Sequence, residues 1–180
     1  VYDLYIAGVG GVKAPADCSW LFASRSETPQ DYKLIDLTAF DTTGVTVMTA
    51  MFYGNKNLTG GIIFGDAFDT SQVTNMTRMF EACCMQTLDL SRFNTGLVKT
   101  MVCMFDHAKI SNLILPDGFV GSSVLSCYGM FDTADVSEID ASSWNMENVS
   151  NIERMFISCT ATKVDITGWD LKSARSIGYL

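Results

Sequence analysis

Few residues in this chain are of the types that usually do chemistry. Among them are a single histidine, His107, and six cysteines, namely Cys18, Cys83, Cys84, Cys103, Cys127 and Cys159. No two cysteines form a Cys-x-x-Cys pair, so the sequence predicts no structural zinc site and assigns no metal ligand among these residues. His107 has no serine or cysteine at a spacing typical of a catalytic pair. It is interpreted as a solvated loop residue.

No other pattern favours an enzyme, since there is no phosphate-binding loop and no metal triad. We therefore expect a noncatalytic protein without a cofactor. The net charge of −8 and the pI near 4.4 argue against nucleic acid as the main partner, because phosphate binding needs clustered Lys and Arg. No apolar run approaches the roughly 18 residues that span a bilayer, so no membrane insertion is expected within this segment.

The main feature of the sequence is an internal repeat of about 25 residues. The dipeptide Met-Phe recurs at steps of 28, 25, 26 and 25 residues, beginning at Met51, Met79, Met104, Met130 and Met155. An aromatic residue stands eleven positions before each of these methionines, at Phe40, Phe68, Phe93, Phe119 and Trp144. Two markers in phase indicate a solenoid, in which each repeat packs on its neighbours.

Each repeat predicts one strand and one short helix. Apolar residues lie six and three positions before the methionine, at it and just after it, and these positions share one face of a helix. Segments such as 33–40 and 86–93 alternate apolar and polar residues, which is typical of a half-buried strand. The predicted fold class is therefore α/β: a right-handed leucine-rich-repeat-like solenoid with a parallel β-sheet on one face and short helices on the other.

We expect a single domain with a capped N-terminus. Residues 1–14 are predicted to form capping strands, and residues 15–180 to form about six to seven solenoid repeats, the last of them truncated. Ala174, Ile177 and Leu180 match the apolar positions of one more repeat. The chain is therefore expected to be part of a longer protein.

Most of the cysteines and methionines are interpreted as core residues. Cys83 and Cys159 share a repeat position three repeats apart, and a disulfide needs Cα atoms within about 7 Å, so these two cannot bridge. A bond between Cys84 and Cys103 on adjacent repeats stays open. Within the stretch VTNMTRMFEACC, residues 73–84, Cys83 is interpreted as a small apolar residue of the inward face. Cys84 lies outside that face, and its role stays open.

The strands offer one candidate binding face. If the leucines of the strand consensus point inward, the open face of the sheet carries Asp36, Asp89, Asp140 and Asp165. Ile63 and Ile114 are expected between them, and Glu138 is expected to face Lys163 on the next strand. Two interpretations stay open: solvated residues of a strand consensus, or a strip that binds a basic partner or Ca²⁺.

The repeat also supports a family resemblance. The pattern Leu-x-Leu-Ser-x-Phe-Asp-Thr-x-x-Val-Thr-Asn-Met-x-x-Met-Phe, carried by residues 88–93 and 68–80, resembles the BspA-like leucine-rich-repeat surface proteins of bacteria and related mycoplasma repeats. The N-terminal YIAGVGGVKAPADCSWLF is similar to the segment that opens such arrays. The resemblance implies an extracellular array on the bacterial cell surface, without catalytic activity, whose partner is a host or extracellular protein or another cell-surface macromolecule.

The leading functional hypothesis is a noncatalytic cell-surface module for binding or adhesion. The alternative is a structural spacer or a virion display module, such as part of a tail fibre. The flanking sequence of the parent gene separates the two, because a signal peptide with a surface anchor favours an adhesin and trimeric fibre segments favour a virion protein.

Overall fold

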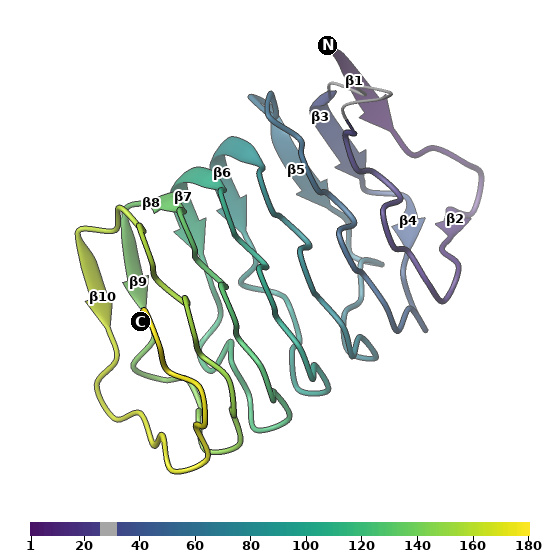
Figure 1. The fold of residues 1–180 in the computed structure, drawn as a ribbon. Coiled ribbons are helices and arrows are strands. Elements are labelled where there is room, and N and C mark those ends of the chain that lie inside the picture. Colours follow the sequence, from purple (N-terminus) through teal and green to yellow (C-terminus); the bar gives the residue numbers. More distant parts are fainter. Residues whose placement is uncertain (26–31) are drawn as a thin grey trace.

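The computed structural model describes residues 1–25 and 32–180, so the predicted repeat region 15–180 includes six residues, 26–31, that lie outside the described residues. Short strands joined by turns build an elongated stack of coils (Figure 1). The strands are β1 Tyr2–Tyr5, β2 Val12–Lys13, β3 Tyr32–Leu37, β4 Phe40–Asp41, β5 Gly61–Phe64, β6 Cys84–Asp89, β7 Lys109–Ile114, β8 Asp135–Val136, β9 Glu138–Asp140 and β10 Lys163–Asp165.

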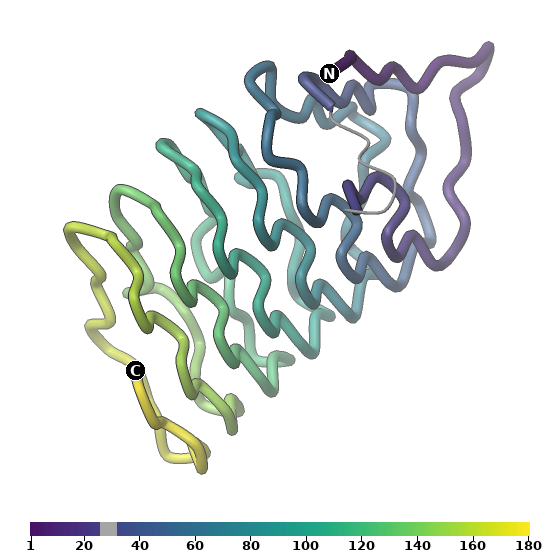
Figure 2. The backbone as a smooth tube through the Cα atoms, turned by 45° about the horizontal axis from the view of Figure 1, so that its top comes forward, coloured from purple at the N-terminus to yellow at the C-terminus, as the bar shows by residue number. Residues whose placement is uncertain are grey.

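All strand pairs are parallel, and each joins one coil, or rung, to the next. The sheets have the orders β1-β3-β5, β6-β7-β8, β9-β10 and β2-β4. An isolated bridge from Leu58 to Met85 links the coils of β5 and β6. Figure 2 shows the successive coils lying side by side from the N-terminus to the C-terminus. We call the side formed by these strands the strand face.

The prediction of short helices on the opposite side is wrong, and with it the α/β class. None of the described residues lies in a helix, and accordingly no helix there is long and apolar enough to cross a membrane. The opposite side, here called the turn face, is a second row of parallel bridges. It runs through Asp17, Val47, Asn75, Thr100, Ser126, Asn151 and Ser176. The fold of the described residues is a parallel β-solenoid.

The turn face replaces helical hydrogen bonds with bonds between rungs. In the rung of Met79, alternate N–H groups donate to carbonyls of the next rung at 2.8 to 3.1 Å, from Met76, Arg78, Phe80 and Ala82. Three overlapping four-residue turns lie along the same segment, closed by Met79 N–H to Met76 O, by Glu81 N–H to Arg78 O and by Cys83 N–H to Phe80 O. The third residue of the first and of the last turn, Arg78 and Ala82, has φ of 58° and 55°, as a type II turn requires.

This geometry explains why the sequence pattern was misleading. A turn of four residues brings every third side chain back to the same side, so apolar residues three apart fit a chain of turns as well as a helix. An isolated helix of two to three turns is marginal in water. Stacking provides the alternate N–H groups with partners in the neighbouring rung, and the turn conformation prevails.

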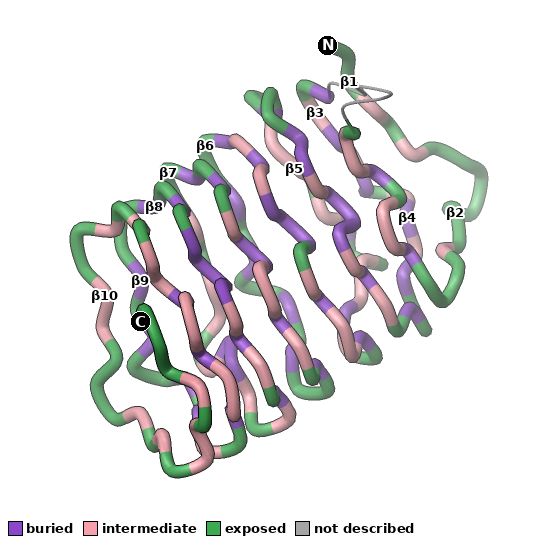
Figure 3. The backbone as a smooth tube through the Cα atoms, in the orientation of Figure 1, coloured by how far each residue is buried: buried purple, intermediate pink, exposed green. Residues whose placement is uncertain are grey.

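The repeated methionines and phenylalanines form the core, as predicted. Met79 and Phe80 are fully buried, and Figure 3 shows buried residues along the interior of successive coils. The phenylalanine rings of adjacent rungs stack: Phe52 on Phe80 at 5.4 Å, and Phe80 on Phe105 at 5.8 Å between ring centroids. Burying side chains of this size stabilises the stack by roughly 1.5–3 kcal/mol each.

The Phe-Asp-Thr motif forms a corner of the coil and clamps two rungs together. The buried Thr42 hydroxyl donates to Asp69 O at 2.8 Å and accepts from Asp69 N–H at 2.6 Å. Thr70 repeats the arrangement with Asn94 on the next rung. The threonine is thus required because its hydroxyl satisfies both backbone groups of the neighbouring chain.

The N-terminal residues join the stack by parallel pairing. Strand β1 pairs with β3, from Tyr2 opposite Tyr32 to Tyr5 opposite Asp36. Strand β2 pairs with β4 further along the same coil.

Candidate binding surfaces

The predicted aspartates lie on the strand face at the expected places in the register. Asp36 is in β3, and Asp89, Asp140 and Asp165 end β6, β9 and β10. Asp140 is the register partner of Asp165. Asp36 is paired with Ile63 and Asp89 with Ile114. The structure therefore brings two of the four carboxylates together and separates the others by isoleucine rungs. Their role in binding stays a prediction.

Each of these carboxylates also accepts hydrogen bonds from the turn that follows its strand. The Asp140 carboxylate accepts from the Ser142 N–H at 3.0 Å and from its hydroxyl at 2.6 Å, and Asp89 accepts from the Ser91 N–H at 2.9 Å. Hydrogen bonds donated by the residue two positions on, first by its side chain and then by its backbone N–H, lower the pKa of Asp89, Asp140 and Asp165. The aspartates form Asx-turns that shape the corner after each strand.

The expected pair of Glu138 and Lys163 has the predicted register, since the two residues are opposite each other. The nearest carboxylate to the Lys163 ammonium is instead that of Asp165, at 3.9 Å. At this separation, on an exposed strand, the charge pair contributes little to stability.

The turn face carries a row of acidic residues that the sequence reasoning missed. Glu81, Asp106 and Asp132 each stand two positions after the methionine of three consecutive rungs, with side chains only 9%, 15% and 10% exposed. We call them the acidic row. Aligning the repeats by their methionines would have revealed it.

Arginines on the same face hold the two ends of the acidic row. The Arg78 guanidinium donates to both oxygens of Glu81, at 2.6 and 3.2 Å. Arg154 donates to Asp132 through Nε at 2.9 Å and Nη2 at 2.8 Å. The central carboxylate, Asp106, contacts Nδ1 of the exposed His107. The row therefore combines three carboxylates with two arginines and one histidine.

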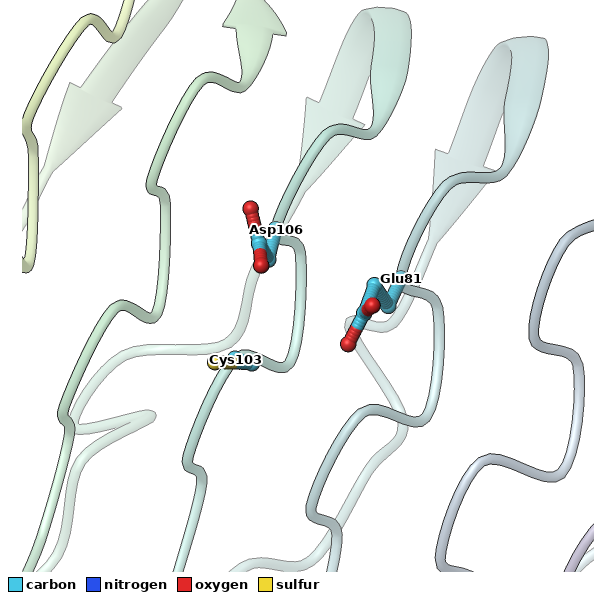
Figure 4. A group of neighbouring side chains, drawn as sticks. All are labelled: Glu81, Cys103 and Asp106. Carbon is cyan, nitrogen blue, oxygen red and sulfur yellow. The ribbon is translucent and has the colours of Figure 1, made fainter.

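Glu81, Cys103 and Asp106 come together at the centre of this region (Figure 4), where one atom of each lies within 4.8 Å of the others. These are types of side chain that bind divalent metals. However, Arg78 already occupies both Glu81 oxygens, and burial raises the pKa of the Cys103 thiol to about 11. A cation here would have to displace an arginine and deprotonate a thiol. The geometry therefore favours an ion-pair network.

All six cysteines are free, so no disulfide joins Cys84 and Cys103. The buried Cys83 thiol donates to Phe52 O at 2.9 Å. Burial raises the pKa of Cys83 and Cys127 to about 12, which leaves these thiols unreactive. Cys84 is different, because it is half-buried beside a groove.

This groove follows the corner where the turn face meets the strand face. We call it the corner groove, and it is lined by residues of five consecutive rungs. They include Lys56, Thr59, Cys84, Gln86, Lys109, Ser111, Asp135, Ser137, Thr160 and Thr162. Towards the turn face it continues past Tyr53 and His107. Sequence reasoning did not identify it, because a corner between two faces has no apolar periodicity.

Comparison with known proteins gives one match. A family model described as "Mycoplasma protein of unknown function, DUF285" matches residues 16–117 and 117–180. No curated protein and no solved structure matches the chain.

Proposed function

The chain belongs to the DUF285 family of Mycoplasma proteins of unknown function, and from this premise we propose that it is a noncatalytic binding or adhesion module. We place it outside the cell, on a bacterial surface, where it recognises a host or extracellular protein or another macromolecule. The proposal includes kinship with the BspA-like repeat proteins, whose sequence pattern the repeats resemble.

One observation carries the proposal: the corner groove is built from five consecutive rungs. A surface that extends along a solenoid suits an elongated partner, and solenoids commonly bind partners over such extended surfaces. The rungs beneath are fixed by stacked aromatic rings and by hydrogen bonds between coils. The groove is therefore presented with little freedom, which reduces the entropy lost on binding.

The chemistry of the described side chains supports the noncatalytic part of the proposal. The thiols of Cys83, Cys103 and Cys127 have raised pKa values. The most buried carboxylates are held by arginines. Among the described residues, the His107 imidazole has one hydrogen-bond partner, the Asp106 carboxylate, so no hydroxyl or thiol nucleophile is hydrogen-bonded to it there.

An adhesion assay tests the function. Beads coated with the chain are applied to cultured animal cells and to cell-free extracellular matrix, and an acidic globular protein of similar size provides the control coating. We expect saturable attachment that soluble chain inhibits. Attachment no greater than that of the control would contradict the proposal and favour the spacer or virion display role.

A further inference from the structure

The corner groove contains two lysines placed on either side of one rung. Lys109 is the register partner of Cys84. On the other side, Cys84 N–H donates to Asn55 O and Leu58 N–H donates to Cys84 O, so Lys56 lies beside Cys84 as well. The two lysines are thus two rungs apart, roughly 10 Å at the usual strand spacing. Their flexible four-carbon stems allow both ammonium groups to approach one ligand above Cys84.

Neither lysine forms an ion pair with a carboxylate of the described residues. Five lysines and arginines lie within 4 Å of an acidic oxygen, namely Arg78, Arg92, Arg154, Lys163 and Lys172, and in the described part of the chain Lys56 and Lys109 are not among them. Asp135 is the register partner of Lys109 and also lines the groove, where its carboxylate accepts from the Thr160 hydroxyl at 2.9 Å. The groove therefore offers two ammonium groups and one carboxylate, which is a net positive charge on a chain whose net charge is −8.

The rest of the groove presents uncharged hydrogen-bonding groups and one aromatic ring. The exposed polar side chains of the floor are those of Thr59, Gln86, Ser111, Ser137 and Thr162. The Tyr53 ring at the turn-face end is fixed by an edge contact with Trp20, at 5.2 Å between centroids. Hydroxyls, an amide and an aromatic surface suit the hydroxyl-rich faces of sugars.

We propose that the corner groove binds an acidic oligosaccharide, with Lys56 and Lys109 together holding one sugar carboxylate. The proposal rests on the binding function above and names its ligand class. The net charge of −8 disfavours nucleic acids and densely sulfated chains, whose many charges would be repelled.

The probe is a hyaluronan hexasaccharide, which has one carboxylate per disaccharide, and the uncharged comparison is chitohexaose. Binding to the chain is measured by calorimetry or by NMR titration. We expect hyaluronan to bind about five- to 25-fold more tightly than chitohexaose, since it gains two exposed ion pairs that are each worth up to about 1 kcal/mol, or about fivefold. Lys56→Gln and Lys109→Gln should each weaken hyaluronan binding roughly fivefold, and Lys109→Arg should retain it.

Lys99→Gln is the matched control, because Lys99 is exposed on the turn face and lies outside the groove. All these side chains are exposed, so the variants are expected to melt like the parent chain. No binding of hyaluronan at millimolar concentration, equal binding of chitohexaose or of hexaglutamate, or an equal loss with Lys99→Gln would overturn the proposal.

The adhesion assay separates this inference from the function. If the double variant Lys56→Gln/Lys109→Gln attaches to cells and matrix as well as the parent chain does, the sugar assignment is wrong and the adhesion function stands. If the parent chain itself does not attach, the proposed adhesion function is wrong, and the hyaluronan titration alone decides the sugar assignment.

Discussion

Two nearly buried carboxylates of the turn face, Glu81 and Asp132, are paired with arginines. The Glu81 side chain is 9% exposed, and desolvation raises its pKa although Arg78 acts in the opposite direction. Burying a carboxylate is costly unless it is paired and hydrogen-bonded. Arg78 provides both, and its guanidinium also lies 5.8 Å from the Tyr53 ring centroid.

Removing Arg78 should therefore lower the free energy of unfolding. Arg78→Ala leaves Glu81 without its two hydrogen bonds, and we expect a loss of about 1–2 kcal/mol, because water reaches the vacated space and limits the penalty. Urea denaturation measures it. The control is Arg92→Ala, which breaks an ion pair with the fully exposed Asp66 and should change the free energy of unfolding by less than about 0.5 kcal/mol. Equal losses in the two variants would refute the distinction.

The acid dependence of stability follows from carboxylates with opposite pKa shifts. The pKa values of Asp89, Asp140 and Asp165 are lowered by their Asx-turn hydrogen bonds. Their contribution is present above the unfolded value of about 3.9 and is lost as the pH falls below it. The pKa of Glu81 is raised by burial, so its contribution acts the other way and increases as the pH falls through that raised value.

Glu81→Gln should consequently make the chain more sensitive to acid. The variant lacks the gain that protonation of Glu81 provides, so its free energy of unfolding should decrease more than that of the parent between about pH 6 and pH 4. Urea titrations at a series of pH values measure the two slopes. Parallel curves would show that Glu81 has an ordinary pKa in the folded chain.

At the scale of the elements, the turn face depends on residues in the left-handed region. One class stands just before the methionine of its rung, as Arg78 and Cys103 do, and a second class stands three positions after it, as Ala82 and Ser158 do. These four residues have φ between 52° and 58°. A non-glycine residue in this region is strained by about 1–2 kcal/mol. The hydrogen bonds between rungs offset that strain.

Ser158 offers a clean test of the strain. It is exposed, its φ is 54°, and Ser158→Gly should raise the free energy of unfolding by roughly 0.5–1 kcal/mol, because glycine adopts this conformation freely. Ser111→Gly in strand β7 is the control and should lower it by roughly 0.5–1 kcal/mol. Thermal melts monitored by circular dichroism measure both. A destabilising Ser158→Gly would indicate that the turn is unstrained.

The strands were predictable from sequence and the turn face was not. Alternation of side chains at period two fixes which residues leave the sheet, so the pairing of Asp140 with Asp165 and of Asp89 with Ile114 was expected and is observed. The apolar residues around Met79 fit both a helix and a series of turns. The choice depends on hydrogen bonds to the next rung, which a pattern within one repeat does not contain.

The same limit applies to the surfaces. The aspartates could be placed because they belong to the strand consensus. Lys56, Cys84 and Lys109 belong to no consensus, and they meet only because the coils bring their positions into register. Sites of this kind become visible when the repeats are aligned and read across the rungs.

At the scale of the whole molecule, each rung contacts chiefly its two neighbours, and stability is shared along the stack. Each interior rung contributes one phenylalanine to a continuous column, such as Phe80 between Phe52 and Phe105. In a stack of this kind stability is approximately a sum of repeat terms and nearest-neighbour interfaces. A defect in an interior rung therefore weakens two interfaces at once.

Met79 and Leu97 allow the weight of a buried position to be measured. Met79 is fully buried and Leu97 is 48% exposed. Met79→Asp places a carboxylate in the core, and we expect a loss greater than about 4 kcal/mol with unfolding of the adjacent rungs. Leu97→Asp should change the free energy of unfolding by less than about 0.5 kcal/mol. Hydrogen exchange locates the opened rungs, and a Met79→Asp chain that melts like the parent would show that this column does not hold the stack together.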